Sequence, residues 1–225
     1  MMITRRTFTA ALSLTGLAAV AGVSPFRLID EAFAQSTKAA TAAEVAKPMS
    51  LPDMALGPKD AAVTVTEYAS MTCSHCAAFN EQVFPKLKAA YIDTGKIRYV
   101  FREFPLDIKA AAGSMLARCI AKDDAPKYFA VTDLLFKTQA EWVLKDTTEQ
   151  LKRIGKQAGL SAAEVETCLK DQALLDKIAA DQKYANEVLK VNSTPSFFVN
   201  GEMLKGETSL EEFAKRIDPL LEKKS

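Results

Sequence analysis

The chain has 225 residues, of which 48% are hydrophobic and 25% are charged, and its formal net charge at pH 7 is +1. This neutral balance, without a basic cluster, argues against nucleic acid or an anionic surface as the main partner. The single histidine, His75, excludes histidine-rich metal sites and any relay between a catalytic cysteine and a distant histidine.

The first 34 residues have the pattern of a removable export signal. Arg5 and Arg6 precede an apolar stretch from about residue 9 to residue 23, and Ala32 to Ala34 provide a small-x-small cleavage site. The apolar stretch is shorter than the roughly 20 residues that span a bilayer. We therefore expect cleavage near Ala34 and export to the periplasm. The paired arginines favour the twin-arginine route, with the general route as the alternative.

Cleavage there lowers the basic residues from 29 to 26 and the acidic residues from 28 to 26, because three arginines and two acidic residues lie in the signal. The mature chain is therefore neutral. Residues 35–52 are rich in Ala, Thr, Ser and Lys and contain no aromatic residue, which predicts a disordered tether. All four cysteines follow in the exported part, where an oxidising compartment permits disulfides.

The order of hydrophobic periodicities predicts the fold. A β-branched strand over 63–69, a helix over 74–93 that Pro85 should kink, and a strand over 97–104 imply a parallel pair with a crossover helix. Residues 107–190 read as helices throughout. A strand then meets Asn200-Gly201, the signal of a type I′ hairpin, and a last helix follows. The result is an α/β (α+β) fold: a mixed central sheet flanked by helices, with an inserted all-helical domain.

Cys73-Ser74-His75-Cys76 lies where the first strand meets the first helix. The unpaired N–H groups and the macrodipole at a helix N-terminus favour a thiolate at Cys73. Cys76 follows one turn later and can close a small disulfide ring with it. His75 between them can stabilise the thiolate by charge or by a hydrogen bond. The motif therefore predicts a redox centre.

Zinc is the main competing use of cysteine, but a structural site needs four ligands, commonly from two paired knuckles. Cys119 and Cys168 are single cysteines on the apolar faces of separate predicted helices. We expect them to form a second disulfide within the helical insert, with two buried free thiols as the alternative. We expect neither a metal nor a cofactor.

From about residue 53 onward, the sequence resembles the DsbA-like thiol:disulfide oxidoreductases, which have a thioredoxin fold with a helical insert. The resemblance rests on Glu67 six residues before Cys73, on the Cys-x-His-Cys motif, on the insert, and on Thr194-Pro195 before a Phe-Phe-Val-Asn-Gly hairpin. It implies a thioredoxin-like domain in two parts, 53–106 and 191–225, around an insert at 107–190.

The resemblance also implies the roles of individual residues. Pro195 would be cis and would face the cysteine pair, and the backbone of Thr194 would bind an extended substrate strand. Glu67 would be a buried carboxyl that assists proton transfer at Cys76. The implied partners are reduced exported proteins and a DsbB-like membrane protein that reoxidises the cysteine pair.

These features predict a monomeric oxidoreductase that donates the Cys73–Cys76 disulfide to exported proteins. Ser74 and Thr194 depart from the family's commonest residues, so a disulfide isomerase or reductase of the same compartment is the alternative. Isomerases of this kind usually dimerise through an added N-terminal domain, and residues 35–52 are too short and polar to form one. A non-enzymatic chaperone or binding module and a glutathione-handling enzyme are further alternatives, which the intact Cys-x-x-Cys pair disfavours.

Overall fold

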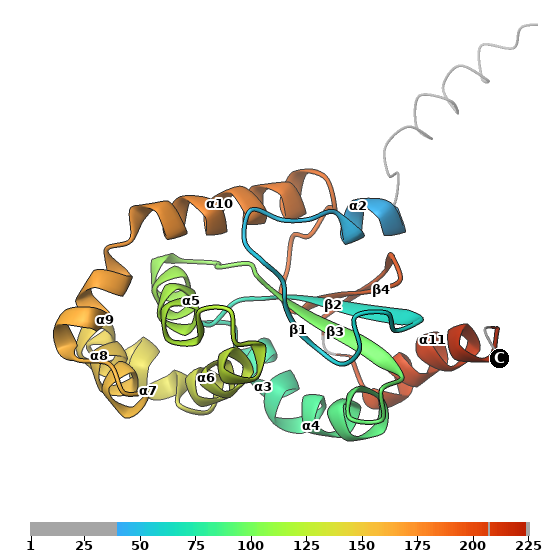
Figure 1. The fold of residues 1–225 in the computed structure, drawn as a ribbon, viewed down its shortest axis with the longest axis horizontal. Coiled ribbons are helices and arrows are strands. Elements are labelled where there is room, and N and C mark those ends of the chain that lie inside the picture. Colours follow the sequence, from blue (N-terminus) through green and yellow to red (C-terminus); the bar gives the residue numbers. More distant parts are fainter. Residues whose placement is uncertain (1–39, 207, 224–225) are drawn as a thin grey trace, which may run out of the picture. The chain divides into compact units, whose positions relative to one another are not determined.

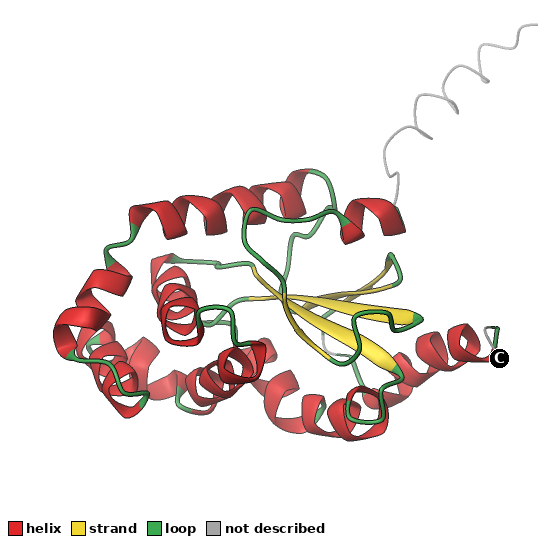
Figure 2. Cartoon of the chain, viewed as in Figure 1, coloured by secondary structure: helices red, strands yellow, loops and turns green. Residues whose placement is uncertain are grey.

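The computed structural model describes residues 40–206 and 208–223 (Figure 1). The export signal predicted over residues 1–34, its cleavage site near Ala34 and the first residues of the predicted tether lie outside the described residues. Among the described helices, none combines the length and the apolarity that crossing a bilayer requires. Figure 2 shows the strands at the centre of the described domain with helices around them.

A five-stranded sheet with the order β1-β3-β2-β4-β5 forms the centre of this domain. The parallel pair predicted from the sequence is confirmed as β2 (Val63–Ala69) beside β3 (Ile97–Glu103). The hairpin of β4 (Ser196–Val199) and β5 (Glu202–Lys205) adds to β2 in the antiparallel direction, which makes the sheet mixed. The hairpin turn has positive φ at Asn200 (45°) and Gly201 (95°), as a type I′ turn requires.

Strand β1 (Met54–Leu56) pairs antiparallel with the outer edge of β3. The sequence analysis missed it, because Pro52, Gly57 and Pro58 around it favour turns. Three residues are too few for an alternating pattern to emerge. The strand forms because the sheet supplies its partner and buries Met54.

The predicted crossover helix is broken, as Pro85 led us to expect. It consists of α3 (Ser74–Gln82), α4 (Phe84–Leu87) and a π-helical turn, η1 (Lys88–Ile92). The break falls at Val83, which places Pro85 in the first turn of α4. Proline is tolerated there because the first N–H groups of a helix have no intrahelical acceptor.

The segment between β3 and β4 contains six helices: α5 (Ile108–Ala121), α6 (Ala125–Lys137), α7 (Gln139–Leu144), α8 (Thr147–Gln157), α9 (Ala162–Leu169) and α10 (Gln172–Glu187). Aspartate or serine caps most of these helices by accepting a backbone N–H from the first turn, at Asp107, Asp124, Asp146, Ser161 and Asp171. Cys119 on α5 and Cys168 on α9 are joined by a disulfide, with Cα atoms 5.8 Å apart.

Two hydrophobic clusters fill the sides of the sheet, and a third fills the insert. Helices α3, α4 and the C-terminal α11 (Leu210–Glu222) cover one side through Phe79, Leu87 and Phe213. Helix α10 covers the other side, where Tyr68 and Phe198 are buried. The insert's cluster includes Met71, Cys76, Phe101, Leu116 and Trp142, so it reaches the Cys-x-x-Cys motif.

A buried ion pair joins the end of β3 to the insert. Arg118 of α5 holds both carboxylate oxygens of Glu103, and the hydroxyl of Tyr128 on α6 donates to the same carboxylate at 2.6 Å. All three side chains are buried. Removing one partner of such a pair costs about 3–5 kcal/mol, because the other charge is left buried and uncompensated. The insert is therefore fixed to the strand that neighbours the Cys-x-x-Cys motif.

The predicted disordered tether is wrong for its described part. Thr41 and Glu44 form a capping box that starts helix α2 (Ala42–Ala46), and Val45 is buried against the sheet. The buried guanidinium of Arg102 donates to the carbonyl oxygen of Val45 at 2.8 Å and pairs with Asp53. Composition suggested disorder because these residues carry little apolar surface of their own. The sheet supplies the partners.

Helix α2 also contacts the turn of the β4–β5 hairpin. A Cβ atom added to Gly201 would lie 2.6 Å from the backbone of Ala42, well inside the contact distance of real Cβ atoms. Gly201 therefore combines a positive φ with a close approach of two backbones. This contact allows the two causes of a glycine requirement to be separated.

We expect Gly201→Ala to lower the free energy of unfolding by more than Gly159→Ala. Gly159 has a similar φ of +93°, but an added Cβ there would meet nothing within 4 Å. The control should lose about 1 kcal/mol from backbone strain alone, and the clash with α2 adds to that loss at Gly201. Urea unfolding of both variants measures the difference. Equal losses would contradict the contact between α2 and the hairpin.

Candidate active site

Cys73 is the N-cap of α3, with extended φ and ψ of −78° and 119°. Strand β2 ends at Ala69, and the N–H of Cys73 then donates to the carbonyl oxygen of Ser70 at 3.1 Å, which closes the turn that leads into the helix. Cys76 lies in the first turn of α3. The two cysteines are reduced in this structure, with no disulfide between them. The junction of strand and helix expected from the sequence is therefore present.

The surroundings lower the pKa of Cys73 from its ordinary value of 9.0 to about 5. The largest cause is a hydrogen bond from the Cys76 thiol, and the Thr194 side chain and the backbone N–H groups of Cys76 and His75 add to it. Burial opposes these effects but does not outweigh them. Cys73 is therefore a thiolate at neutral pH.

Cys76 has the opposite environment. Its side chain has no exposed surface, whereas Cys73 is 9% exposed. Burial raises the pKa of Cys76, and its hydrogen bond to Cys73 and the negative charge of Glu67 raise it further. The two sulfur atoms therefore differ: Cys73 is the accessible, stabilised thiolate, and Cys76 is the buried thiol that needs a proton acceptor before it can react.

Glu67 lies on β2 with 3% of its surface exposed. Burial raises the pKa of its carboxyl from 4.5 to about 8, a hydrogen bond from Tyr99 lowers it, and the charge of Cys73 raises it. The hydroxyl of Tyr99 donates to Oε2 of Glu67 at 2.5 Å. Glu67 is thus a buried carboxyl that interacts electrostatically with both cysteines, and its role in proton transfer stays a prediction.

The Thr194–Pro195 peptide bond is cis, and the loop faces the cysteines. Sγ of Cys73 lies 3.2 Å from the carbonyl oxygen of Thr194. Oγ1 of Thr194 is buried with no partner that meets full hydrogen-bond geometry, yet the side chain is near enough to the sulfur to lower the pKa of Cys73. The loop that is distant in sequence therefore touches the reactive sulfur.

The side chains of Ser74 and His75 are exposed. The backbone N–H of His75 is one of the groups that lower the pKa of Cys73. An electrostatic role of the His75 imidazole stays a prediction.

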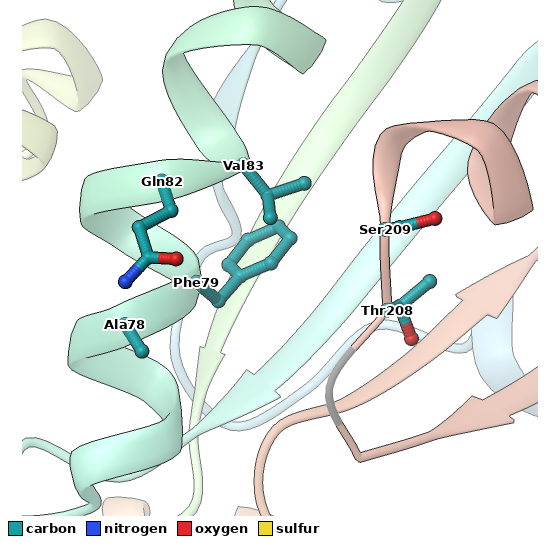
Figure 3. A pocket seen from close by; sticks show the side chains of 6 residues that line it. All are labelled: Ala78, Phe79, Gln82, Val83, Thr208 and Ser209. Carbon is teal, nitrogen blue, oxygen red and sulfur yellow. The ribbon is translucent and has the colours of Figure 1, made fainter.

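A groove of about 340 Å³ lies between α3 and the segment that precedes α11 (Figure 3). Phe79 and Val83 extend from α3 toward Thr208 and Ser209, which precede α11. The chain that carries Thr208 is connected to the cis-proline loop, because the N–H of Gly206 donates to the carbonyl oxygen of Pro195 at 3.0 Å. The groove therefore lies between the helix that begins at Cys73 and the segment that follows the cis-proline hairpin.

Sequence reasoning missed three groups that hold the site. Tyr99 binds Glu67, the side-chain amide of Gln139 donates to the carbonyl oxygens of Met71 and Cys73 at 2.9 and 3.0 Å, and the Thr72 hydroxyl donates to Asp107. The sequence did contain a signal for Tyr99. Because β2 and β3 are parallel neighbours, Tyr99 and Glu67 face the same side of the sheet, two positions apart along it. Gln139 carried no signal, because nothing in the sequence places α7 beside the cysteines.

The second disulfide removes the zinc alternative that required all four cysteines at one site, because Cys119 and Cys168 bond to each other. Across residues 40–206 and 208–223, no group of three or more His, Cys, Asp or Glu side chains has a metal-binding arrangement.

A family model described as "Thioredoxin" matches residues 49–219. A "Putative protein-disulfide oxidoreductase" of Rickettsia bellii is 37% identical over 171 residues, which are 76% of this chain and 65% of that protein. The chain spans between 60 and 65% of the length of the five Rickettsia relatives that it matches. The "Probable disulfide bond formation protein D" of Bacillus anthracis is 33% identical, over 75% of this chain and 78% of that protein.

Solved structures agree with these relatives. The crystal structure of Wolbachia pipientis alpha-DsbA1 superposes with a TM-score of 0.73 at 35% identity and covers 81% of this chain and 97% of that one. BdbD from Bacillus subtilis, at 22% identity and a TM-score of 0.66, shares the fold over 76% of this chain and 93% of that one. The chain therefore belongs to the thioredoxin family and, within it, to the DsbA-like proteins.

Proposed function

We propose that this protein is a thiol:disulfide oxidoreductase that donates the Cys73–Cys76 disulfide to reduced exported proteins. One feature of the site carries the proposal: Cys73 is the N-cap of α3, where a hydrogen bond from the buried Cys76 thiol and nearby backbone N–H groups lower its pKa to about 5, so the reduced pair contains a stabilised thiolate. Stabilising the reduced form makes the disulfide form a stronger oxidant. An oxidising site is what a disulfide donor needs.

The size of this effect follows from the pH dependence. A thiol with its ordinary pKa of 9.0 is protonated at pH 7, whereas Cys73 has been ionised since about pH 5. At pH 7 the reduced pair is stabilised by the two pH units that separate the Cys73 pKa of about 5 from the ambient pH. Two units correspond to nearly 3 kcal/mol, or about 60 mV for a two-electron couple. This contribution disappears as the pH falls through 5, where Cys73 takes up its proton.

The reaction begins with the disulfide form of the pair. A substrate thiolate attacks Sγ of Cys73, the exposed sulfur, and displaces Cys76, which gives a mixed disulfide. Cys76 leaves as a thiolate in a buried site and takes the proton that Glu67 carries below about pH 8. A second substrate thiolate then attacks the substrate's sulfur in the mixed disulfide, and Cys73 leaves as its stabilised thiolate.

The cis-proline loop supplies a surface for the substrate backbone. An extended chain that pairs with the backbone at Thr194 would bring its cysteine to Sγ of Cys73, which lies 3.2 Å from the Thr194 carbonyl oxygen. The groove lined by Phe79 and Val83 would receive an apolar side chain of the same segment. Backbone pairing with a single apolar pocket suits many unfolded sequences, as a folding oxidase requires.

The remaining parts of the proposal rest on the family. The protein acts in the periplasm after removal of its signal near Ala34, a DsbB-like membrane protein reoxidises it, and it acts as a monomer. A disulfide isomerase or reductase is the second candidate, because the names of the relatives fit both directions of electron flow. The Thr194 side chain lowers the pKa of Cys73, and this favours the donor direction.

Equilibration of the purified protein with glutathione buffers, together with an assay of disulfide formation in a reduced test protein, decides the direction. We expect a potential well above the roughly −270 mV of thioredoxin and net oxidation of the test protein. A Cys76→Ser variant should not oxidise the test protein, and in the glutathione buffers it should accumulate a mixed disulfide between Cys73 and glutathione, because no second thiol displaces the glutathione. A thioredoxin-like potential without oxidation of the test protein would refute the donor function.

Thr194→Val should raise the pKa of Cys73 by about one unit, because one group that stabilises the thiolate is lost. The redox potential should fall with it. Thiolate absorbance in the ultraviolet, followed against pH, measures the midpoint. Thr208→Val is the matched control, since its buried hydroxyl donates to the Gly206 carbonyl oxygen and not to the sulfur. An unchanged midpoint in Thr194→Val would show that this side chain does not tune Cys73.

A further inference from the structure

Tyr99 is a buried titratable residue for which the proposed reaction has so far no use. Its side chain has no exposed surface, and its hydroxyl donates to Oε2 of Glu67 at 2.5 Å. On the parallel strands, Tyr99 lies opposite Val65, and Glu67 lies two residues further toward the cysteines. The Tyr99 side chain therefore reaches along the sheet toward the motif.

Two phenylalanines hold the ring of Tyr99. The Phe84 ring of α4 lies 5.0 Å from it and the Phe129 ring of α6 lies 6.0 Å from it, both tilted by 50° to 60°. Phe84 and Phe129 stack on each other, with 7° between their planes. The hydroxyl of Tyr99 therefore has a fixed position, and it supplies a hydrogen-bond donor to Glu67 without reorganisation.

The charge state of Glu67 decides which proton transfers it can perform. As an acid it must be protonated when Cys76 leaves, and burial provides this state. As a base it must be a carboxylate when Cys76 attacks, which burial opposes. A hydroxyl that donates to the carboxyl oxygen favours the carboxylate. The two directions of the cycle therefore depend on Tyr99 to different extents.

We propose that Tyr99 is a positioning residue that keeps Glu67 available as the base for reoxidation of the cysteine pair. The proposal rests on the disulfide-exchange function proposed above and deepens it. It assigns Tyr99 to the half of the cycle that regenerates the oxidant, and it leaves the half that oxidises the substrate to the protonated form of Glu67.

The reoxidation step balances as follows. The Cys73 thiolate attacks a disulfide of the oxidant, which forms a mixed disulfide and releases one thiolate. The Cys76 thiol gives its proton to the Glu67 carboxylate, and the new thiolate attacks Sγ of Cys73. The Cys73–Cys76 bond forms, the bond from Cys73 to the oxidant breaks, and a second thiolate leaves. The pair loses two electrons, the oxidant's disulfide gains them, and Glu67 later releases its proton to solvent.

The titratable groups that face Glu67 come from three elements. They are Tyr99 on β3, Cys73 and Cys76 at the start of α3, and Tyr128 on α6. In the mixed disulfide, Cys73 carries no charge and no longer raises the pKa of Glu67. Burial and the Tyr99 hydroxyl are then the two opposing effects on the carboxyl. The Tyr99 hydroxyl therefore has its largest influence on the pKa of Glu67 in the mixed disulfide, which is the state in which Glu67 must act as a base.

The test uses the reduced protein with a large excess of oxidised glutathione, so that the attack by Cys76 becomes the slow, concentration-independent step. In the wild type, its rate should rise with pH, with a midpoint below the pKa of about 8 that Glu67 has in the reduced protein, because Cys73 is uncharged in the mixed disulfide. In Tyr99→Phe, we expect the profile to move to higher pH and the rate at neutral pH to fall about tenfold or more, tenfold for each unit of pKa. The Cys73 thiolate titration should not change.

Two variants separate this role from a loss of packing. Tyr128→Phe removes an equally buried hydroxyl from another carboxylate, Glu103, and should leave the pH profile in place. Glu67→Gln removes the base, so adding Tyr99→Phe to it should have no further effect. If Tyr99→Phe does not fold, a ring-fluorinated tyrosine at position 99 keeps the packing and donates more strongly, and the profile should move to lower pH.

An unshifted profile in a folded Tyr99→Phe or fluorinated protein, with a wild type that exchanges disulfides, overturns the role of Tyr99 alone. A shift of the same size in Tyr128→Phe would also overturn it, because the effect would then come from packing. A wild type that exchanges no disulfide with glutathione or protein thiols overturns the proposed function itself, and this inference falls with it.

Discussion

The interaction on which the site depends is the hydrogen bond between its two sulfur atoms. The Cys76 thiol donates to Cys73, and this is the largest cause of the low pKa of Cys73. The same bond raises the pKa of Cys76. One contact therefore lowers the pKa of one cysteine and raises the pKa of the other, and the burial of Cys76 increases the difference. The fold's contribution is to hold one sulfur near the surface and the other inside.

The rest of the domain keeps that arrangement in place. The Cys-x-x-Cys turn is held by Gln139 of the insert, and the cis-proline loop is held by the hairpin that pairs with β2. Phe129 packs against both the insert's cluster and the cluster of Phe79, Leu87 and Phe213 on one side of the sheet. The insert is therefore part of the architecture of the site, since it supplies contacts to the turn, to Tyr99 and to Glu103.

Much of this could be predicted from the sequence, because β2, the crossover helix and the hairpin carry strong local signals. The break beside Pro85, the Asn200-Gly201 turn and the Cys119–Cys168 pairing follow from residue chemistry. Strand β1 and helix α2 could not be predicted, since each forms on surfaces supplied by distant residues such as Arg102. Gln139 and Tyr99 are similar cases. Their roles depend on which side chains meet across elements, and no periodicity within one element reports that.

The unequal sulfurs have a consequence for proton stoichiometry. Between about pH 5 and neutrality, the reduced pair carries a single sulfur-bound proton, because Cys73 is already ionised and Cys76 is not. Oxidation of the pair therefore releases one proton for two electrons, where an ordinary dithiol releases two. The potential of such a pair changes by about 30 mV per pH unit, half the slope of an ordinary dithiol. Relative to ordinary dithiols, whose potentials fall twice as steeply, the protein would thus become a stronger oxidant by about 30 mV for each unit by which the pH rises in this range.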